Sequence, residues 1–176
     1  MINMKSVVLV AGLTALVAGS AFAQSQSTNR VAANTDWSVF VEDNPTECWA
    51  VSTPKESVNS RDGRVVAVNR GQTLLMVTYR PSPGEKGQIA FTGGYPFASG
   101  STVQLDISGT KFKMFTDGEW AWTANVDDDK KVVSAMKRGA DAVLVGRSGR
   151  GTETKDSFSL LGFTAAVEDA AKRCSG

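Results

Sequence analysis

The stretch that decides the fold reads TVQLDISG, residues 102–109. Its apolar side chains, Val103, Leu105 and Ile107, alternate with polar ones, which is the pattern of a β-strand with one buried and one wet face. Ser108-Gly109 then suits a tight hairpin connection, because glycine accepts the positive φ that such turns require. The stretch therefore predicts an antiparallel hairpin.

Short runs of similar composition recur on both sides of this stretch and are separated by turn residues such as Asp62-Gly63 and Asp117-Gly118. We expect further strands at Trp37–Val41, Cys48–Ser52, Arg64–Asn69, Leu74–Arg80, Gln88–Thr92, Lys111–Phe115, Glu119–Trp122, Asp141–Gly146 and Asp156–Leu160. About ten short strands at this spacing predict an all-β or mainly β fold, either an antiparallel β-sandwich or a partly closed barrel.

Two helices are expected to interrupt the strands. A short internal helix begins at the acidic run Asp127–Asp129 and ends before Gly139, since acids favour a helix start and glycine a helix end. A C-terminal helix runs from about Phe163 to Arg173. Its apolar residues recur at helical spacing and lead to Cys174, so this helix should pack on the strands.

The first 23 residues have the three parts of a secretory signal peptide. Lys5 is followed by an apolar run from Val7 to Ala18 and by Ala21-Phe22-Ala23, a cleavage site of the small-x-small type. The run is shorter than the roughly 20 residues of a membrane-spanning helix, and we expect no transmembrane span. We therefore predict a signal peptide at residues 1–23, a flexible segment at 24–35 and one β-rich domain at 36–176.

Composition excludes several classes of function. The chain has no histidine, which removes Ser-His-Asp and Cys-His catalysis and Cys/His zinc sites. With 19 Lys and Arg against 18 Asp and Glu, it lacks the basic surplus of a general nucleic-acid binder. The acids Glu119, Asp117 and Glu153 allow a carboxylate pair, but nothing selects one. We expect no catalytic residue, metal or cofactor.

The two cysteines, Cys48 and Cys174, have no other cysteine with which to pair. In an oxidising compartment, a single disulfide is the simplest interpretation, and it would tie the C-terminal segment to the body of the domain. A two-cysteine metal site and two free thiols are the alternatives.

Two groups of residues are candidates for ligand binding. The glycine-rich run 146–152 is typical of a plain connection between strands. Arg147 and Arg150 within it give the alternative of an anion site. Aromatic side chains form the second group, because large rings at a surface can bind a partner or a carbohydrate, with core packing as the alternative. They are Tyr95, Phe97, Trp120 and Trp122.

The chain resembles the invasion-associated locus B family of exported bacterial proteins. The resemblance rests on GYPF at 94–97, AW at 121–122, MKRGA at 136–140, SGRGT at 148–152, SLLGFTAA at 159–166 and the final Cys174. It implies export to the cell envelope, and the founding member is associated with the entry of a pathogen into erythrocytes. It brings no enzymatic activity and no cofactor.

We therefore expect an exported, disulfide-bridged envelope protein that is not an enzyme and that binds an envelope or host-surface component. It would be periplasmic, associated peripherally with the outer membrane, or secreted. The alternative is a periplasmic carrier with a small-molecule pocket inside the β-sandwich.

Overall fold

The computed structural model describes residues 29–44, 46–81 and 86–175. The expected signal peptide at 1–23, and residues 24–28 of the segment expected to be flexible, lie outside the described residues. The described part is mainly β, as predicted, and also contains two helices. No helix in these ranges has the length and apolar character that crossing a bilayer requires.

The strands are β1 (Arg30–Asn34), β2 (Trp37–Asp43), β3 (Thr46–Ser52), β4 (Glu56–Arg61), β5 (Arg64–Val65), β6 (Leu74–Tyr79), β7 (Lys86–Thr92), β8 (Thr102–Ile107), β9 (Thr110–Asp117), β10 (Trp120–Trp122), β11 (Asp141–Arg147) and β12 (Glu153–Ser159). The helices are α1 (Val126–Met136) and α2 (Phe163–Arg173).

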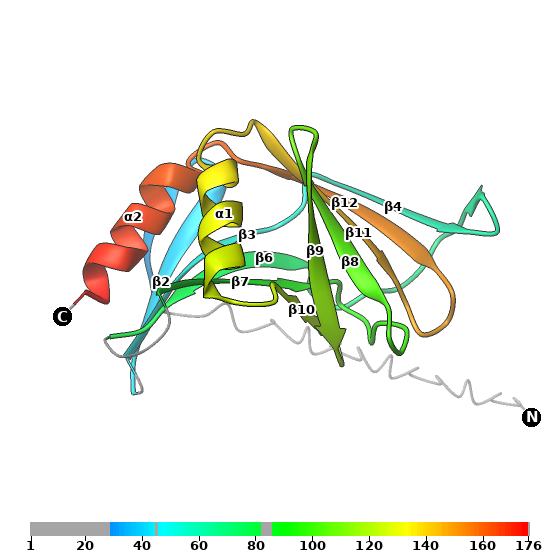
Figure 1. Cartoon of the computed structure of the whole chain (residues 1–176), viewed down its shortest axis with the longest axis horizontal. Helices are drawn as coiled ribbons and strands as arrows, with labels where there is room; N and C mark the ends of the chain where they lie inside the picture. The colour runs from blue at the N-terminus through cyan, green and yellow to red at the C-terminus, as the bar shows by residue number, and fades with distance from the viewer. Residues whose placement is uncertain (1–28, 45, 82–85, 176) are drawn as a thin grey trace, which may run out of the picture.

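All these strands belong to one sheet, in the order β1-β2-β3-β6-β7-β10-β9-β8-β11-β12-β4-β5, with β1 and β5 at its open edges. The sheet folds over so that β2, β3, β6 and β7 lie beside the helices and β8, β9, β11 and β12 lie on the other side (Figure 1). The Trp37 indole N–H donates to the Ser159 carbonyl at 2.9 Å, which joins the start of β2 to the end of β12. The expected sandwich or partly closed barrel is thus one continuous, folded sheet.

The predicted hairpin turns are confirmed. Ile107 pairs with Thr110 across Ser108-Gly109, and both turn residues have positive φ, 48° and 91°. This is the type I′ geometry whose twist matches that of the flanking strands. The second hairpin also forms, but its two-residue loop is Gly118-Glu119, one residue later than the expected Asp117-Gly118, because Asp117 pairs with Trp120 as the last residue of β9.

Two strand predictions are wrong. The Arg64–Asn69 run forms a strand only at Arg64–Val65, where it is the second arm of a hairpin with β4. Residues 30–34, expected to be flexible, form the edge strand β1 on β2. β4 (ESVNSR) is polar and β1 (RVAAN) is short with no apolar–polar alternation, and backbone pairing to a neighbouring strand holds both in place.

The core lies between the two halves of the sheet. Inward-facing residues from both halves and from both helices form a single cluster of buried side chains. Phe91 on β7 contacts Phe158 on β12 edge to face, with 6.2 Å between ring centroids. Phe163 of α2 packs in the same way on Trp37 at 4.8 Å. Both helices therefore cover the inner face of the sheet.

Helix α1 begins as predicted, although its third acid has a further role. Asn125 caps the helix by accepting from the amides of Asp127 and Asp128. Asp129 is buried and accepts from the Ile89 amide at 2.8 Å, so it joins the first turn of α1 to β7. The basic pair Lys137 and Arg138 follows the helix instead of ending it.

Helix α2 begins at a glycine, and any other residue at this position would force the neighbouring backbone to move. Gly162 has a φ of 88°, and a Cβ there would lie 1.9 Å from the Asn34 carbonyl oxygen. The close approach brings the end of β1 against the start of α2, and this is the physical reason for glycine at the helix entry.

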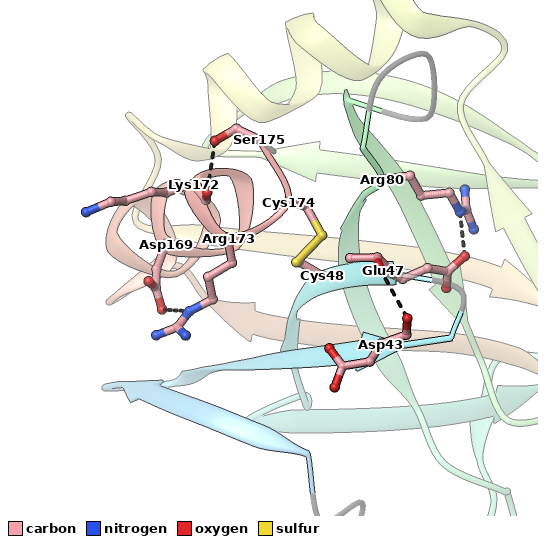
Figure 2. Close-up of a disulfide and its surroundings, with 10 residues drawn as sticks. Asp43, Glu47, Cys48, Arg80, Asp169, Lys172, Arg173, Cys174 and Ser175 are labelled. Carbon is pink, nitrogen blue, oxygen red and sulfur yellow. Dashed lines mark hydrogen bonds and ion pairs between the residues drawn. A yellow bond between two sulfur atoms is a disulfide. The ribbon is translucent and has the colours of Figure 1, made fainter.

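The predicted disulfide joins Cys48 on β3 to Cys174, the residue after α2 (Figure 2). The two Cα atoms are 5.9 Å apart, and both cysteines are buried. Nearby, the Arg80 guanidinium pairs with the Glu47 carboxylate, and Arg173 pairs with Asp169 within α2 (Figure 2). The bridge therefore fastens the end of the chain to the centre of one half of the sheet.

Replacing both Cys48 and Cys174 with Ala should lower the free energy of unfolding. The bridge joins residues 126 positions apart, and in the chain-entropy model a loop of that size corresponds to about 4 to 5 kcal/mol. We expect urea denaturation to show this loss, and hydrogen exchange to show weaker protection in α2. Wild-type protein in reductant is the matched control and should behave like the variant. Two free thiols in oxidised protein, found by mass spectrometry, would contradict the pairing.

Candidate functional site

A hollow of about 580 Å³ lies where the β4–β5 region, the loop after β7 and the loop between β11 and β12 meet. Its lining residues are Arg61, Ala67, Val68, Asn69, Arg70, Gly94, Tyr95, Pro96, Glu119, Ser148, Gly149, Arg150, Thr152 and Thr154. We call it the polar groove. Its volume is within the range of small-molecule sites, and its lining mixes charges, hydroxyls and one aromatic ring.

A buried ion pair adjoins the polar groove through Arg70, which lines it. Asp156 faces inward from β12 and is fully buried. Arg70 donates to both of its carboxylate oxygens, at 2.9 and 2.7 Å, and the Ser57 hydroxyl donates at 2.6 Å. The Arg70 Nε also donates to the Gly93 carbonyl at 2.8 Å. One guanidinium thus links β12 to the end of β7, and this bidentate geometry is the strongest that Arg and a carboxylate can form.

Tyr95 forms one wall of the polar groove. Its hydroxyl lies 2.6 Å from the Thr154 hydroxyl, and the Arg70 guanidinium carbon lies 5.2 Å from the ring centroid. Phe97 packs against the same ring edge to face at 5.0 Å. Burial raises the pKa of the Tyr95 hydroxyl and outweighs the Thr154 hydrogen bond and the Arg70 charge, which lower it. The ring is therefore fixed and its hydroxyl stays neutral at physiological pH.

The loop between β11 and β12 forms an adjoining wall. The Ser148 amide donates to the Thr152 carbonyl at 2.8 Å, and the Thr152 amide returns a bond to the Ser148 hydroxyl at 3.1 Å. The Gly149 amide donates to the Pro96 carbonyl at 2.9 Å, which ties the two walls together. Arg150 projects from this braced loop and is exposed.

The predicted binding residues are not brought together at one place. Tyr95 and Arg150 line the polar groove. Phe97 was expected at a surface, but it is 8% exposed and belongs to the core. Arg147 lies at the end of β11, where strand alternation places it on the face opposite the buried Leu144 and Gly146. The predicted Arg147–Arg150 pair therefore does not share the polar groove.

Trp120 and Trp122 lie on the outer face of the sheet. They stack with 6.4 Å between ring centroids, and both are half-buried. Trp122 belongs to a line of directly paired residues across the sheet, which we call the outer row: Ser38, Val51, Met76, Ala90, Trp122, Phe115 and Thr102. The outer row contains no charged residue, and Phe115 is 49% exposed.

Arg70 and Asp156 were missed at the level of sequence. Asp156 carried a readable signal, because Phe158 faces the core and strand alternation puts Asp156 on the same inward face. A carboxylate at a core position needs a buried partner. Nothing local identifies that partner as Arg70, which is 86 residues earlier in an irregular segment.

A titration of the tyrosines tests the packing of Tyr95 and Tyr79, the two tyrosines of the chain. Burial, with help from the nearby charge of Glu168, raises the pKa of Tyr79 to about 12. We expect native protein to show little tyrosinate absorbance just above pH 10, where urea-unfolded protein is largely ionised. Since the unfolded chain loses its protons first, native stability should fall as the pH rises from about 10 toward 12.

The variants Tyr79→Phe and Tyr95→Phe assign the two transitions. A native tyrosine that ionises at the ordinary pKa of about 10 would show that its hydroxyl is in contact with solvent, against this account.

Comparison with known proteins gives the family. The sequence matches the profile of a family described as invasion associated locus B (IalB) protein over residues 37–171. No curated protein matches it. The structure is similar to the crystal structure of invasion associated protein b from Bartonella henselae, with a TM-score of 0.54 and 16% sequence identity over 80% of this chain and 95% of that one. That likeness shows the fold, and the family match spans both the polar groove and the outer row. The chain belongs to the invasion associated locus B family.

Proposed function

We propose that this chain is an exported, non-catalytic binding protein of the bacterial envelope that recognises an envelope or host-cell component through the outer face of its sheet. The observation that carries this proposal is the outer row, an uncharged line of side chains that includes Phe115 and Trp122, with Trp120 stacked beside them. Both helices pack on the inner face, so no helix of the described chain covers this row.

The composition of the outer row resembles the centre of a protein interface. Interface cores are depleted in charge and enriched in Trp, Phe and Met, and the row has one of each in contiguous register. A second aromatic pair, Phe40 on β2 and Trp49 on β3, stacks with 6.3 Å between ring centroids. Aromatic rings that stay half-exposed on a sheet face favour partner recognition over core packing.

Export is supported by the sequence and by the disulfide. The signal-peptide pattern at residues 1–23 directs the chain out of the cytoplasm, and a disulfide such as Cys48–Cys174 persists in oxidising compartments. A periplasmic, outer-membrane-associated or secreted location fits both.

A non-catalytic role is supported by the chemistry of the polar groove. The one carboxylate that lines it is Glu119, and the buried carboxylate beside it, Asp156, is already engaged by Arg70 and Ser57. Over the described ranges, no three Asp, Glu or Cys side chains come together as a metal site. The alternative of a carrier with an interior pocket has less support, because Phe91, Phe97 and Phe158 fill the space between the halves of the sheet.

Replacing the paired indoles tests the proposal. The variant Trp120→Ser/Trp122→Ser should lower saturable binding of the secreted protein to isolated bacterial envelopes or mammalian cell membranes by about tenfold or more, because buried aromatic anchors dominate interface energetics. Sedimentation with each membrane preparation measures the binding, and thermal unfolding checks the fold.

The matched control is Val143→Ser/Val145→Ser, which removes two half-buried apolar side chains from the outer face of β11, away from the outer row. Its binding should equal that of the wild type. Absence of saturable binding to either preparation, or equal losses in both double variants, would refute a recognition role for the outer row.

A further inference from the structure

We propose that the polar groove is a second binding site, specific for a small organic oxyanion, a carboxylate or phosphate of about the size of a monosaccharide, which Arg61 and Arg150 hold. This site lies on loops at one end of the folded sheet, whereas the proposed recognition surface lies on its outer face. An experiment that refutes one of the two proposals therefore leaves the other untouched.

Within the part of the chain that the structure describes, Arg61 and Arg150 are cations without a carboxylate partner. Both line the polar groove, Arg61 from the end of β4 and Arg150 from the β11–β12 loop. The ion pairs of the described chain involve neither of them. Their guanidinium groups thus have donors free for a ligand, and guanidinium matches carboxylate and phosphate by paired hydrogen bonds.

The Arg61 guanidinium is held against the loop that carries Arg150, whose own side chain is exposed. Arg61 donates from Nη2 to the Thr152 hydroxyl at 2.8 Å, two residues after Arg150. The hydrogen bonds between Ser148 and Thr152, and from Gly149 to Pro96, fix that loop. A site whose donors are already braced loses less conformational entropy on binding, so its affinity is higher.

Arg70 differs from the other two arginines. Its charge is neutralised by Asp156 beneath the groove, and it shapes the site without being free to bind. Glu119 is the single carboxylate among the lining residues, against three guanidinium groups. The groove therefore keeps a positive surplus that favours an anion.

The rest of the lining indicates an organic ligand larger than a bare ion. Tyr95, Pro96, Ala67 and Val68 supply apolar surface, whereas Asn69 and Glu119 supply groups that can bond to ligand hydroxyls. A volume of about 580 Å³ accommodates a molecule of monosaccharide size. A sugar acid or a sugar phosphate has this combination of acid group, hydroxyls and apolar face.

Titrations of the mature chain at constant ionic strength test the site. The probes are glucuronate for the carboxylate, glucose 1-phosphate for the phosphate, inorganic phosphate and neutral glucose. The readout is the NMR chemical shift of the backbone amides. We expect saturable changes at residues 148–152 with at least one of the two sugar acids and none with glucose. The sugar acid that binds more tightly shows whether the site prefers a carboxylate or a phosphate. Weaker binding of inorganic phosphate than of glucose 1-phosphate would show that the sugar ring contributes to binding.

Charge-neutral variants locate the binding. Arg61→Gln/Arg150→Gln should weaken it by about tenfold or more, since charge-assisted hydrogen bonds are lost. Arg150→Gln alone removes no hydrogen bond within the described chain. Weaker anion binding by this single variant would therefore not be explained by lost folding contacts. The control Arg64→Gln/Arg147→Gln makes the same charge change at exposed arginines outside the lining, and it should bind like the wild type.

Three results would each overturn the proposal: no saturable shift with any acidic probe, glucose binding as tightly as the sugar acids, or an equal loss in the control variant. The last would mean that the net charge of the chain, and no built site, attracts the anions. None of these results bears on binding through the outer row.

Discussion

The ion pair between Arg70 and Asp156 is the interaction on which the loops around the polar groove depend. Asp156 is fully buried on an inner strand, and a carboxylate in that position is tolerated only with a charged, hydrogen-bonded partner. Arg70 supplies this partner from an irregular segment and also binds the Gly93 carbonyl. The pair therefore determines where that segment and the loop after β7 lie, and these form two sides of the polar groove.

The rest of the molecule separates two surfaces by packing. The sheet folds over a core that also takes in both helices, and the disulfide fastens the second helix at its end. Strand alternation then leaves the uncharged outer row on one face. The polar groove carries the guanidinium groups of Arg61 and Arg150, which form no ion pair among the described residues. One domain thus presents an uncharged row on the outer face of its sheet and a groove lined by arginines, and the two binding proposals refer to these two surfaces.

The sequence predicted what depends on local pattern. The alternation of Val103, Leu105 and Ile107 predicted a strand, and Ser108-Gly109 predicted the turn after it. The single pair of cysteines predicted the disulfide. The sequence could not predict that β1 and β4 are strands, because their pairing depends on neighbours and not on their own side chains. Tyr95 and Arg150 were found as single residues, but their partners Arg70 and Arg61 come from distant positions. The path of the irregular segment before β6 brings Arg70 to the Gly93 carbonyl, and the pairing of β4 with β12 brings Arg61 to Thr152. No periodicity encodes either meeting.

A double-mutant cycle on the buried pair tests this account most directly. Urea denaturation would give the free energy of unfolding of Asp156→Asn, Arg70→Met and the double variant. Removing either partner leaves the other charge buried without a counter-charge. We therefore predict that each single variant loses about 3 to 5 kcal/mol of unfolding free energy. The double variant should lose much less than the sum, with a coupling energy of about 2 kcal/mol or more. Single losses below about 1 kcal/mol that simply add would contradict the central place given to this pair.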